Sequence, residues 1–149
     1  MEIKTMDKKG LDFLALEEGL RLKPYPDSKG IPTIGIGCTY YENGTKVKLT
    51  DPPITKERAL QLFQNIRDLY EKTVWSVTRD DISQNQFNAL VSLTYNIGIK
   101  GFKESTVLER VNANPKDPSI TEAFKMWRNS GGKPVLLERR IREAKLYFS

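Results

Sequence analysis

The sequence contains no histidine and a single cysteine, and both shortages exclude whole classes of chemistry. Without histidine, Ser–His and Cys–His catalysis is ruled out and the commonest zinc ligand is missing. Cys38 has no partner for an internal disulfide, which fits folding in a reducing compartment or indifference to redox state. Acid–base chemistry must therefore come mainly from Asp, Glu, Lys, Tyr or Cys. We expect a metal-independent protein without a cofactor, because no acidic cluster has ligand spacing.

Long apolar runs are missing as well. No stretch is long enough to span a bilayer, and the polar residues 1–9 lack the apolar core of a signal peptide. We therefore expect no stable membrane insertion, and action outside the producing cell would require separate delivery. The net charge of +5 suits an anionic partner, whether nucleic acid, a membrane surface or a charged cell wall.

The patterns that are present predict an α+β protein. Apolar periodicity and turn signals indicate helices over residues 6–18, 55–75, 83–97, 104–113, 120–128 and 134–148. Asp7 and Thr55 are expected N-caps, and Ser83 and Ser119 each open a capping-box pattern. Short strands are expected at Tyr25 and at residues 34–36, with another within 40–53. The helix over 83–97 is apolar nearly all round, which predicts a central position.

The 149 residues are the size of one domain. Within it we expect a small sheet-containing lobe over residues 19–54 and a connecting helix over 55–75. Residues 76–149, with the first helix, would form a helical lobe. A small sheet beside a helical body often leaves a cleft where ligands bind.

Two carboxylates, Glu18 and Asp27, frame the step from the first helix into the strands. Glycoside hydrolysis needs such a pair, one to protonate the leaving oxygen and one to activate water or attack the sugar. Glu18 is expected at a helix C-terminus, where the helix dipole disfavours the ionised form. Asp27 is expected in a polar turn that keeps it ionised, and opposite protonation states assign acid and base roles. The alternative is that both carboxylates are ordinary solvated charges.

Residues 33–38 read Thr-Ile-Gly-Ile-Gly-Cys. Strand alternation would place Thr33, Gly35 and Gly37 on one face and Cys38 on the other, as a buried thiol. A face of one hydroxyl and two glycines would be flat and open enough for a sugar ring. A bent or bulged strand is the competing interpretation.

Residues 18–37 closely resemble the catalytic region of phage-type lysozymes. Glu18, Asp27 and Thr33 match that family's catalytic spacing, with eight residues between the first two and five between the last two. The resemblance continues in order through residues 86–91, 95–98, 101–102, 127, 131–133 and 138–144. It implies a lysozyme-like fold with a small antiparallel sheet and a helical body.

The resemblance implies that Glu18 is the general acid, that Asp27 positions or activates the attacking water, and that Thr33 helps to hold it. It also implies an arginine of the last helix paired with Glu18. Arg139 is the first candidate, with Arg140 and Arg142 as rivals, and a solvated surface charge is the alternative reading. Asn96 would contact substrate, or else cap a helix end. Gly35 would lie beneath the sugar, on the open strand face.

The implied reaction is hydrolysis of the β-1,4 bond between N-acetylmuramic acid and N-acetylglucosamine in bacterial peptidoglycan, for host cell lysis. The family is regarded as inverting, although sequence leaves the carboxyl separation open. We expect a monomer with peptidoglycan as its partner, held in the host cytoplasm until a separate pore releases it. The chain departs from the family at Cys38, where many relatives have His, and in residues 40–53.

Three rival functions are a wall-binding module without catalysis, a nucleic-acid binder and a hydrolase of chitin. The intact triad disfavours the first. Positive charge spread along the chain, dense only in the run Arg139, Arg140 and Arg142, disfavours nucleic acid, since such runs usually form a solvated helix face. Chitin shares the N-acetylated sugars, so the triad does not exclude it.

Overall fold

A computed structural model describes residues 2–149 of the protein. Its elements, in chain order, are α1 (Lys8–Glu18), β1 (Arg21–Pro26), β2 (Pro32–Gly35), α2 (Lys56–Val77), α3 (Gln84–Ile97), α4 (Ile99–Lys103), α5 (Thr106–Ala113), α6 (Ile120–Lys125) and α7 (Leu137–Tyr147). One small antiparallel sheet precedes a series of helices, so the predicted α+β class is confirmed. The chain forms two compact units: a sheet-bearing unit, Asp12–Leu69, and a helical unit that combines the residues up to Leu11 with Tyr70–Ser149.

The sheet-bearing unit is built on the pairing of β1 with β2. Tyr25 lies opposite Thr33 and Pro26 opposite Pro32, with an irregularity in the register between Arg21 and Tyr25. The strand predicted within residues 40–53 is wrong, because this segment holds an isolated bridge between Tyr40 and Lys46 instead. Residues 40–53 therefore form a loop with one short hydrogen-bonded turn, and they add no strand to the sheet.

A small apolar core holds the sheet-bearing unit together. Its buried side chains come from β2, from the loop that follows it and from the start of α2: Ile34, Cys38, Val47, Ile54, Ala59 and Leu62. Cys38 is fully buried, which confirms the expectation of a buried thiol. The loop is thus anchored to α2 by apolar contacts, although little of it is regular structure.

The predicted strand alternation over residues 33–38 is wrong beyond Gly35. Gly35 and Gly37 have φ angles of +67° and +71°, which suit glycine and end the strand. The chain then folds back, and Ile34 and Cys38 exchange backbone hydrogen bonds of 2.8 and 3.0 Å. A Cβ added to Gly35 would lie 3.6 Å from the Ala59 Cβ, so α2 covers this position and the expected open strand face is absent.

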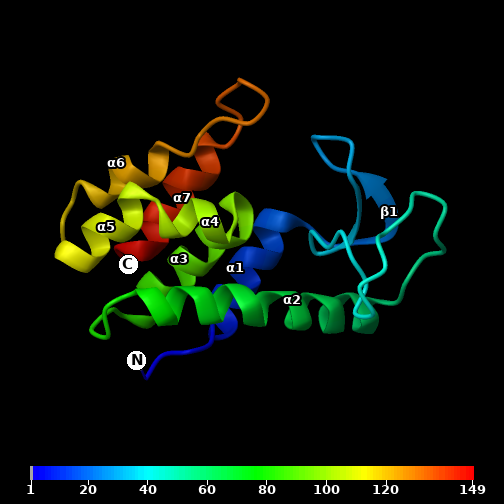
Figure 1. Cartoon of the computed structure of the whole chain (residues 1–149), viewed down its shortest axis with the longest axis horizontal. Coiled ribbons are helices and arrows are strands. Elements are labelled where there is room, and N and C mark those ends of the chain that lie inside the picture. Colours follow the sequence, from blue (N-terminus) through cyan, green and yellow to red (C-terminus); the bar gives the residue numbers. More distant parts are fainter. Residues whose placement is uncertain (1) are drawn as a thin grey trace. The chain divides into compact units, whose positions relative to one another are not determined.

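In the helical unit, α3 lies at the centre, as its apolar pattern predicts. Every residue from Phe87 to Thr94 is buried, and α7 packs against this helix (Figure 1). Phe124 and Tyr147 add an aromatic contact between α6 and α7, with ring centroids 6.0 Å apart. Among residues 2–149, no helix has both the length and the apolar character to cross a bilayer.

The structure shows which of the four predicted N-caps form. Asp7 and Thr55 each accept a backbone N–H of the following turn, and Ser83 with Gln86 forms the reciprocal capping box. The capping box predicted at Ser119 is wrong, because this residue is itself helical and its side chain makes no cap bond. The Asp117 carboxylate accepts the Ser119 N–H instead, at 2.9 Å.

The helix expected over residues 104–113 is in fact preceded by a separate short helix, α4. Ser105 divides the two helices. Its hydroxyl donates to the Phe102 carbonyl and accepts the Leu108 N–H, which closes α4 and caps α5.

Candidate active site

Glu18 is the last residue of α1, where the sequence places it. Gly19 has a φ angle of +76° and its N–H bonds to the Ala15 carbonyl at 2.8 Å, so the chain leaves the helix immediately after the glutamate. The side chain of Glu18 is half-buried. A carboxyl at this place is fixed by the helix yet still open to solvent.

Asp27 is held by a tight turn between the two strands. Its Oδ1 accepts the N–H groups of Lys29 and Ile31, at 2.8 and 2.9 Å. Its Oδ2 accepts no hydrogen bond from residues 2–149. Backbone amides therefore fix the orientation of the carboxylate through Oδ1, and Oδ2 is left for a ligand.

The backbone of Ile31 ties Asp27 to Thr33. The Ile31 carbonyl accepts both the Asp27 N–H, at 2.9 Å, and the Thr33 hydroxyl, at 2.8 Å. Because Thr33 donates its only hydroxyl proton to that carbonyl, its oxygen can act toward a ligand only as an acceptor. Thr33 is nearly fully buried, so its orientation is fixed by packing as well.

Tyr25 is a further residue of this region that the sequence reasoning did not assign. Burial raises the pKa of its phenol, and the negative charges of Glu18 and Asp27 act in the same direction. Arg21 opposes this and lies over the Tyr25 ring, 4.5 Å from its centroid. The phenol is therefore within electrostatic reach of both carboxylates. In the sequence, the only indication of a role for Tyr25 is its position within residues 18–37, the segment that resembles the family's catalytic region.

The sheet-bearing unit combines three groups that acid–base hydrolysis can use. It offers a half-buried carboxyl at a helix end, a carboxylate oriented by amides, and a hydroxyl that can only accept. Water has two protons to donate, and Asp27 and Thr33 supply two suitable acceptors. Among residues 2–149, no group of three or more Cys, Asp or Glu side chains is placed to hold a metal ion.

The supporting residues predicted on α7 lie in a buried ionic cluster of the helical unit. Arg139 donates to Glu143 Oε2 at 3.1 Å and to the Ser92 carbonyl at 3.2 Å. Arg140 pairs with Glu143 Oε1 at 3.2 Å and donates to the side-chain oxygen of Asn96. The solvated alternative is wrong for these two arginines, since both are buried. Pairing of Glu18 with Arg139 stays a prediction, as does substrate contact by Asn96. Gly35 is buried against Ala59, so the open strand face on which its predicted sugar contact depends is absent.

Glu143 is the acidic centre of this cluster. Burial raises the pKa of its carboxyl, and the guanidinium groups of Arg140 and Arg139 act in the opposite direction. The Ser92 hydroxyl donates to the same carboxylate at 2.5 Å. Asn96 is exposed, so its side-chain oxygen joins the buried Arg140 to the surface.

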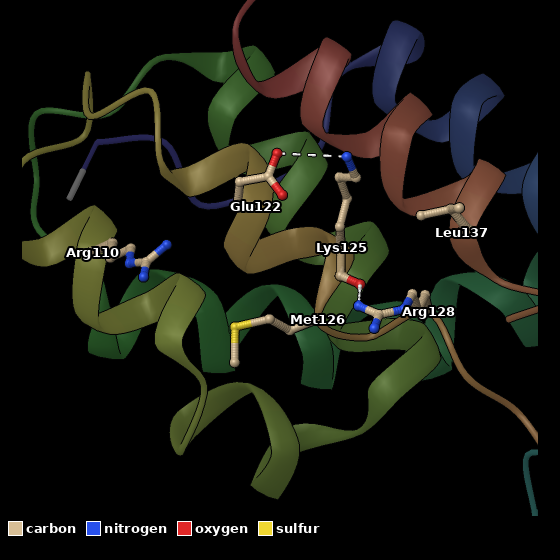
Figure 2. A pocket seen from close by; sticks show the side chains of 6 residues that line it. All are labelled: Arg110, Glu122, Lys125, Met126, Arg128 and Leu137. Atoms are coloured by element: carbon tan, nitrogen blue, oxygen red, sulfur yellow. Dashed lines mark hydrogen bonds and ion pairs between the residues drawn. The ribbon is translucent and has the colours of Figure 1, made fainter. Parts of the chain in front are cut away.

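The helical unit also has a cavity of about 390 Å³ that carries a different chemistry (Figure 2). Its only carboxylate, Glu122, is paired with Lys125 at 3.5 Å. Arg110 and Arg128 also line the cavity and donate to backbone carbonyls. One paired carboxylate among several cations does not supply an acid and a base, so this cavity is not the candidate active site.

Comparison with known proteins agrees with the class that the fold and the site define. The family model described as phage lysozyme matches residues 15–143. An endolysin of Salmonella phage P22 is 40% identical over 141 residues, covering 94% of this chain and 95% of the relative.

Two solved structures extend the likeness to the fold. A mutant of P22 lysozyme is 38% identical with a TM-score of 0.84, covering 99% of this chain and 100% of the other. An endolysin from Escherichia coli O157:H7 phage FAHEc1 is 38% identical with a TM-score of 0.88, covering 97% and 94%. The chain belongs to the phage lysozyme family, and it is a glycoside hydrolase of the muramidase class.

Proposed function

We propose that the protein cleaves the β-1,4 bond between N-acetylmuramic acid and N-acetylglucosamine by an acid–base mechanism on two carboxylates. Family membership supports the coarser statement, peptidoglycan hydrolysis for host cell lysis. The observation that carries the finer proposal is the geometry of Asp27, whose Oδ1 is held by two amides while its Oδ2 is left for a ligand.

In this mechanism Glu18 protonates the glycosidic oxygen as the bond to the leaving sugar breaks. Asp27 accepts a proton from the attacking water, and Thr33 accepts the second hydrogen bond of that water. Tyr25, close to both carboxylates, is a positioning residue for them. A helix-end residue, a turn residue and a strand residue thus act together because they lie within one compact unit.

Attack by a base-activated water predicts inversion at the anomeric carbon. Proton NMR of the first products from a soluble glycan oligomer would show the α anomer first. Initial release of the β anomer would contradict the role of Asp27 as a base, because retention requires a covalent or equivalent intermediate. Chitin oligomers assayed beside peptidoglycan test the specificity for the muramic acid bond.

The central test is release of reducing sugar from purified peptidoglycan by the native chain and by Glu18→Gln. The substitution keeps the shape of the side chain and removes its proton donor, so we expect a loss of about a hundredfold or more. Glu17→Gln, the adjacent glutamate of the same helix, is the matched control. Equal activity of native chain and Glu18→Gln would show that Glu18 is not the acid, and an inactive native chain would favour a binding module.

A further inference from the structure

A second cavity, this one in the sheet-bearing unit, includes residues next to the candidate catalytic residues in the chain. It has a volume of about 350 Å³ and is lined by Ile31, Pro32, Thr39, Tyr40, Lys46 and Val47. None of these residues belongs to the predicted catalytic set of Glu18, Asp27 and Thr33. All of them lie within the sheet-bearing unit. Its position and its chemistry together suggest a ligand.

The backbone places this cavity next to the reacting groups. Ile31 lines the cavity, while its N–H is bonded to the Asp27 carboxylate and its carbonyl to the Thr33 hydroxyl. Pro32 also lines the cavity and directly precedes Thr33 in β2. The cavity and the candidate catalytic residues therefore share the backbone of residues 31–33.

The opposite side of the cavity is formed by a tight turn of the loop after β2. Tyr40 and Lys46 form a backbone bridge, and the Val47 N–H bonds to the Thr39 carbonyl at 3.0 Å. Buried Val47 anchors this turn in the apolar core. The cavity is thus supported on both sides by hydrogen-bonded backbone, which suits a preformed binding site.

The lining combines an apolar surface with one positive charge. Ile31 is 45% exposed and Tyr40 47% exposed, so an aliphatic and an aromatic side chain are both open to a ligand at this cavity. Lys46 is exposed and has no acidic partner among residues 2–149. An aromatic ring suits the apolar face of a sugar, and an unpaired ammonium suits a carboxylate.

We propose that this cavity is a specificity site for the glycan next to the cleaved bond, with Tyr40 stacking on a sugar ring and Lys46 pairing with a carboxylate. The inference rests on the proposed function and deepens it. Peptidoglycan offers two sources of that carboxylate: the peptide stems, and the lactyl group of muramic acid once the stem is removed. Both present the same chemistry to Lys46.

The test compares the native chain, Tyr40→Leu, Lys46→Gln and Lys48→Gln on three preparations of sacculi. The first is intact, the second has its stems removed by an amidase, and the third has its carboxylates converted to amides. Lys48 has the same charge in the same loop and does not line the cavity, so it is the matched control. kcat and KM are measured separately at low and at high salt.

We expect Tyr40→Leu to raise KM about tenfold on all three preparations, which corresponds to one good stacking contact. Lys46→Gln should raise KM about threefold on intact sacculi at low salt, less at high salt, and not on amidated sacculi. If the Lys46 effect survives amidase treatment, the freed lactyl carboxylate can replace the stem carboxylate; if it disappears, only the stem supplies the carboxylate.

Two results separate this inference from the function on which it rests. If the native chain is active but Lys46→Gln matches Lys48→Gln on every preparation, or Tyr40→Leu leaves KM unchanged, the cavity is not a specificity site. If the native chain releases no saccharide at all, the proposed function fails and this inference fails with it.

Discussion

The two units use charged side chains in opposite ways. In the sheet-bearing unit, Asp27 is in a turn, held by backbone amides and left with one oxygen open. In the helical unit, Glu143 is fully buried and surrounded by arginines and a serine hydroxyl. Charges of the first kind should control rate with little effect on stability, and those of the second kind should control stability.

The largest expected effect is on activity, from Asp27→Asn. The amide keeps an oxygen at Oδ1 for the two N–H groups, so the turn should persist while the base is lost. We expect kcat to fall about a hundredfold or more, with the free energy of unfolding changed by less than about 0.5 kcal/mol. Reducing-sugar assays and urea unfolding measure the two quantities, and Asp12→Asn is the control. A large loss of stability would mean that Asp27 is structural.

The complementary prediction concerns Glu143→Ala. Removing the shared carboxylate takes the Glu143 ion pairs away from two buried guanidinium groups, Arg139 and Arg140, so we expect a loss of about 3–5 kcal/mol in the free energy of unfolding. Glu138→Ala, at an exposed position of the same helix, should cost less than about 0.5 kcal/mol. Urea unfolding of both variants measures the difference. Equal losses would contradict the assignment of a structural role to the buried cluster.

A smaller effect distinguishes two serines of the helical unit that share one sequence pattern. Ser83 forms a capping box and Ser119 does not. Ser83→Ala should lower the free energy of unfolding by about 1 kcal/mol, and Ser119→Ala should lower it clearly less. Thermal or urea unfolding of the two variants tests this, and equal costs would show that the cap geometry has no energetic role.

The smallest effect is a pH dependence of the sheet-bearing unit. Burial raises the pKa of the Tyr41 phenol to about 12, helped by the hydrogen bond that it donates to Asp51. The resulting stability is fully present below the unfolded value of about 10 and is lost as pH rises through the folded value. As pH rises from about 10 to about 12, the urea midpoint of unfolding should fall in the native chain. In Tyr41→Phe, which lacks the phenol, the midpoint should fall less over the same range. Tyr40→Phe is the control. If its midpoint shows the same reduced dependence on pH, the effect does not come from Tyr41.

The sequence was sufficient for features that depend on local chemistry. The caps at Asp7, Thr55 and Ser83, the helix stop at Gly19 and the burial of α3 follow from residue type and spacing, and all are confirmed. The same holds for the turn at Asp27, where Pro, Asp, Ser and Gly occur together. These local hydrogen bonds and the apolar periodicity of α3 are therefore readable without the fold, although the capping box predicted at Ser119 does not form.

Features that depend on a distant partner were not predictable. Strand alternation predicts an open face at Gly35, but the Ala59 side chain of α2 covers this position. Arg139 and Arg140 belong to a run that reads as solvated, whereas in the fold both are buried in contact with polar groups of Glu143, Ser92 and Asn96. The role of Ile31 in linking Asp27 to Thr33 is equally invisible, since it uses the backbone alone.

The burial of Cys38 makes the protein its own reporter of local opening. Its thiol is 0% exposed in the core of the sheet-bearing unit, and it is the only thiol in the sequence. A thiol-specific reagent can modify it only during excursions that expose this core, so the rate of labelling measures how often that core opens. The helical unit has no thiol, so the labelling rate reports on the surroundings of Cys38 in the sheet-bearing unit. A slower rate in the presence of glycan would show that glycan stabilises this core.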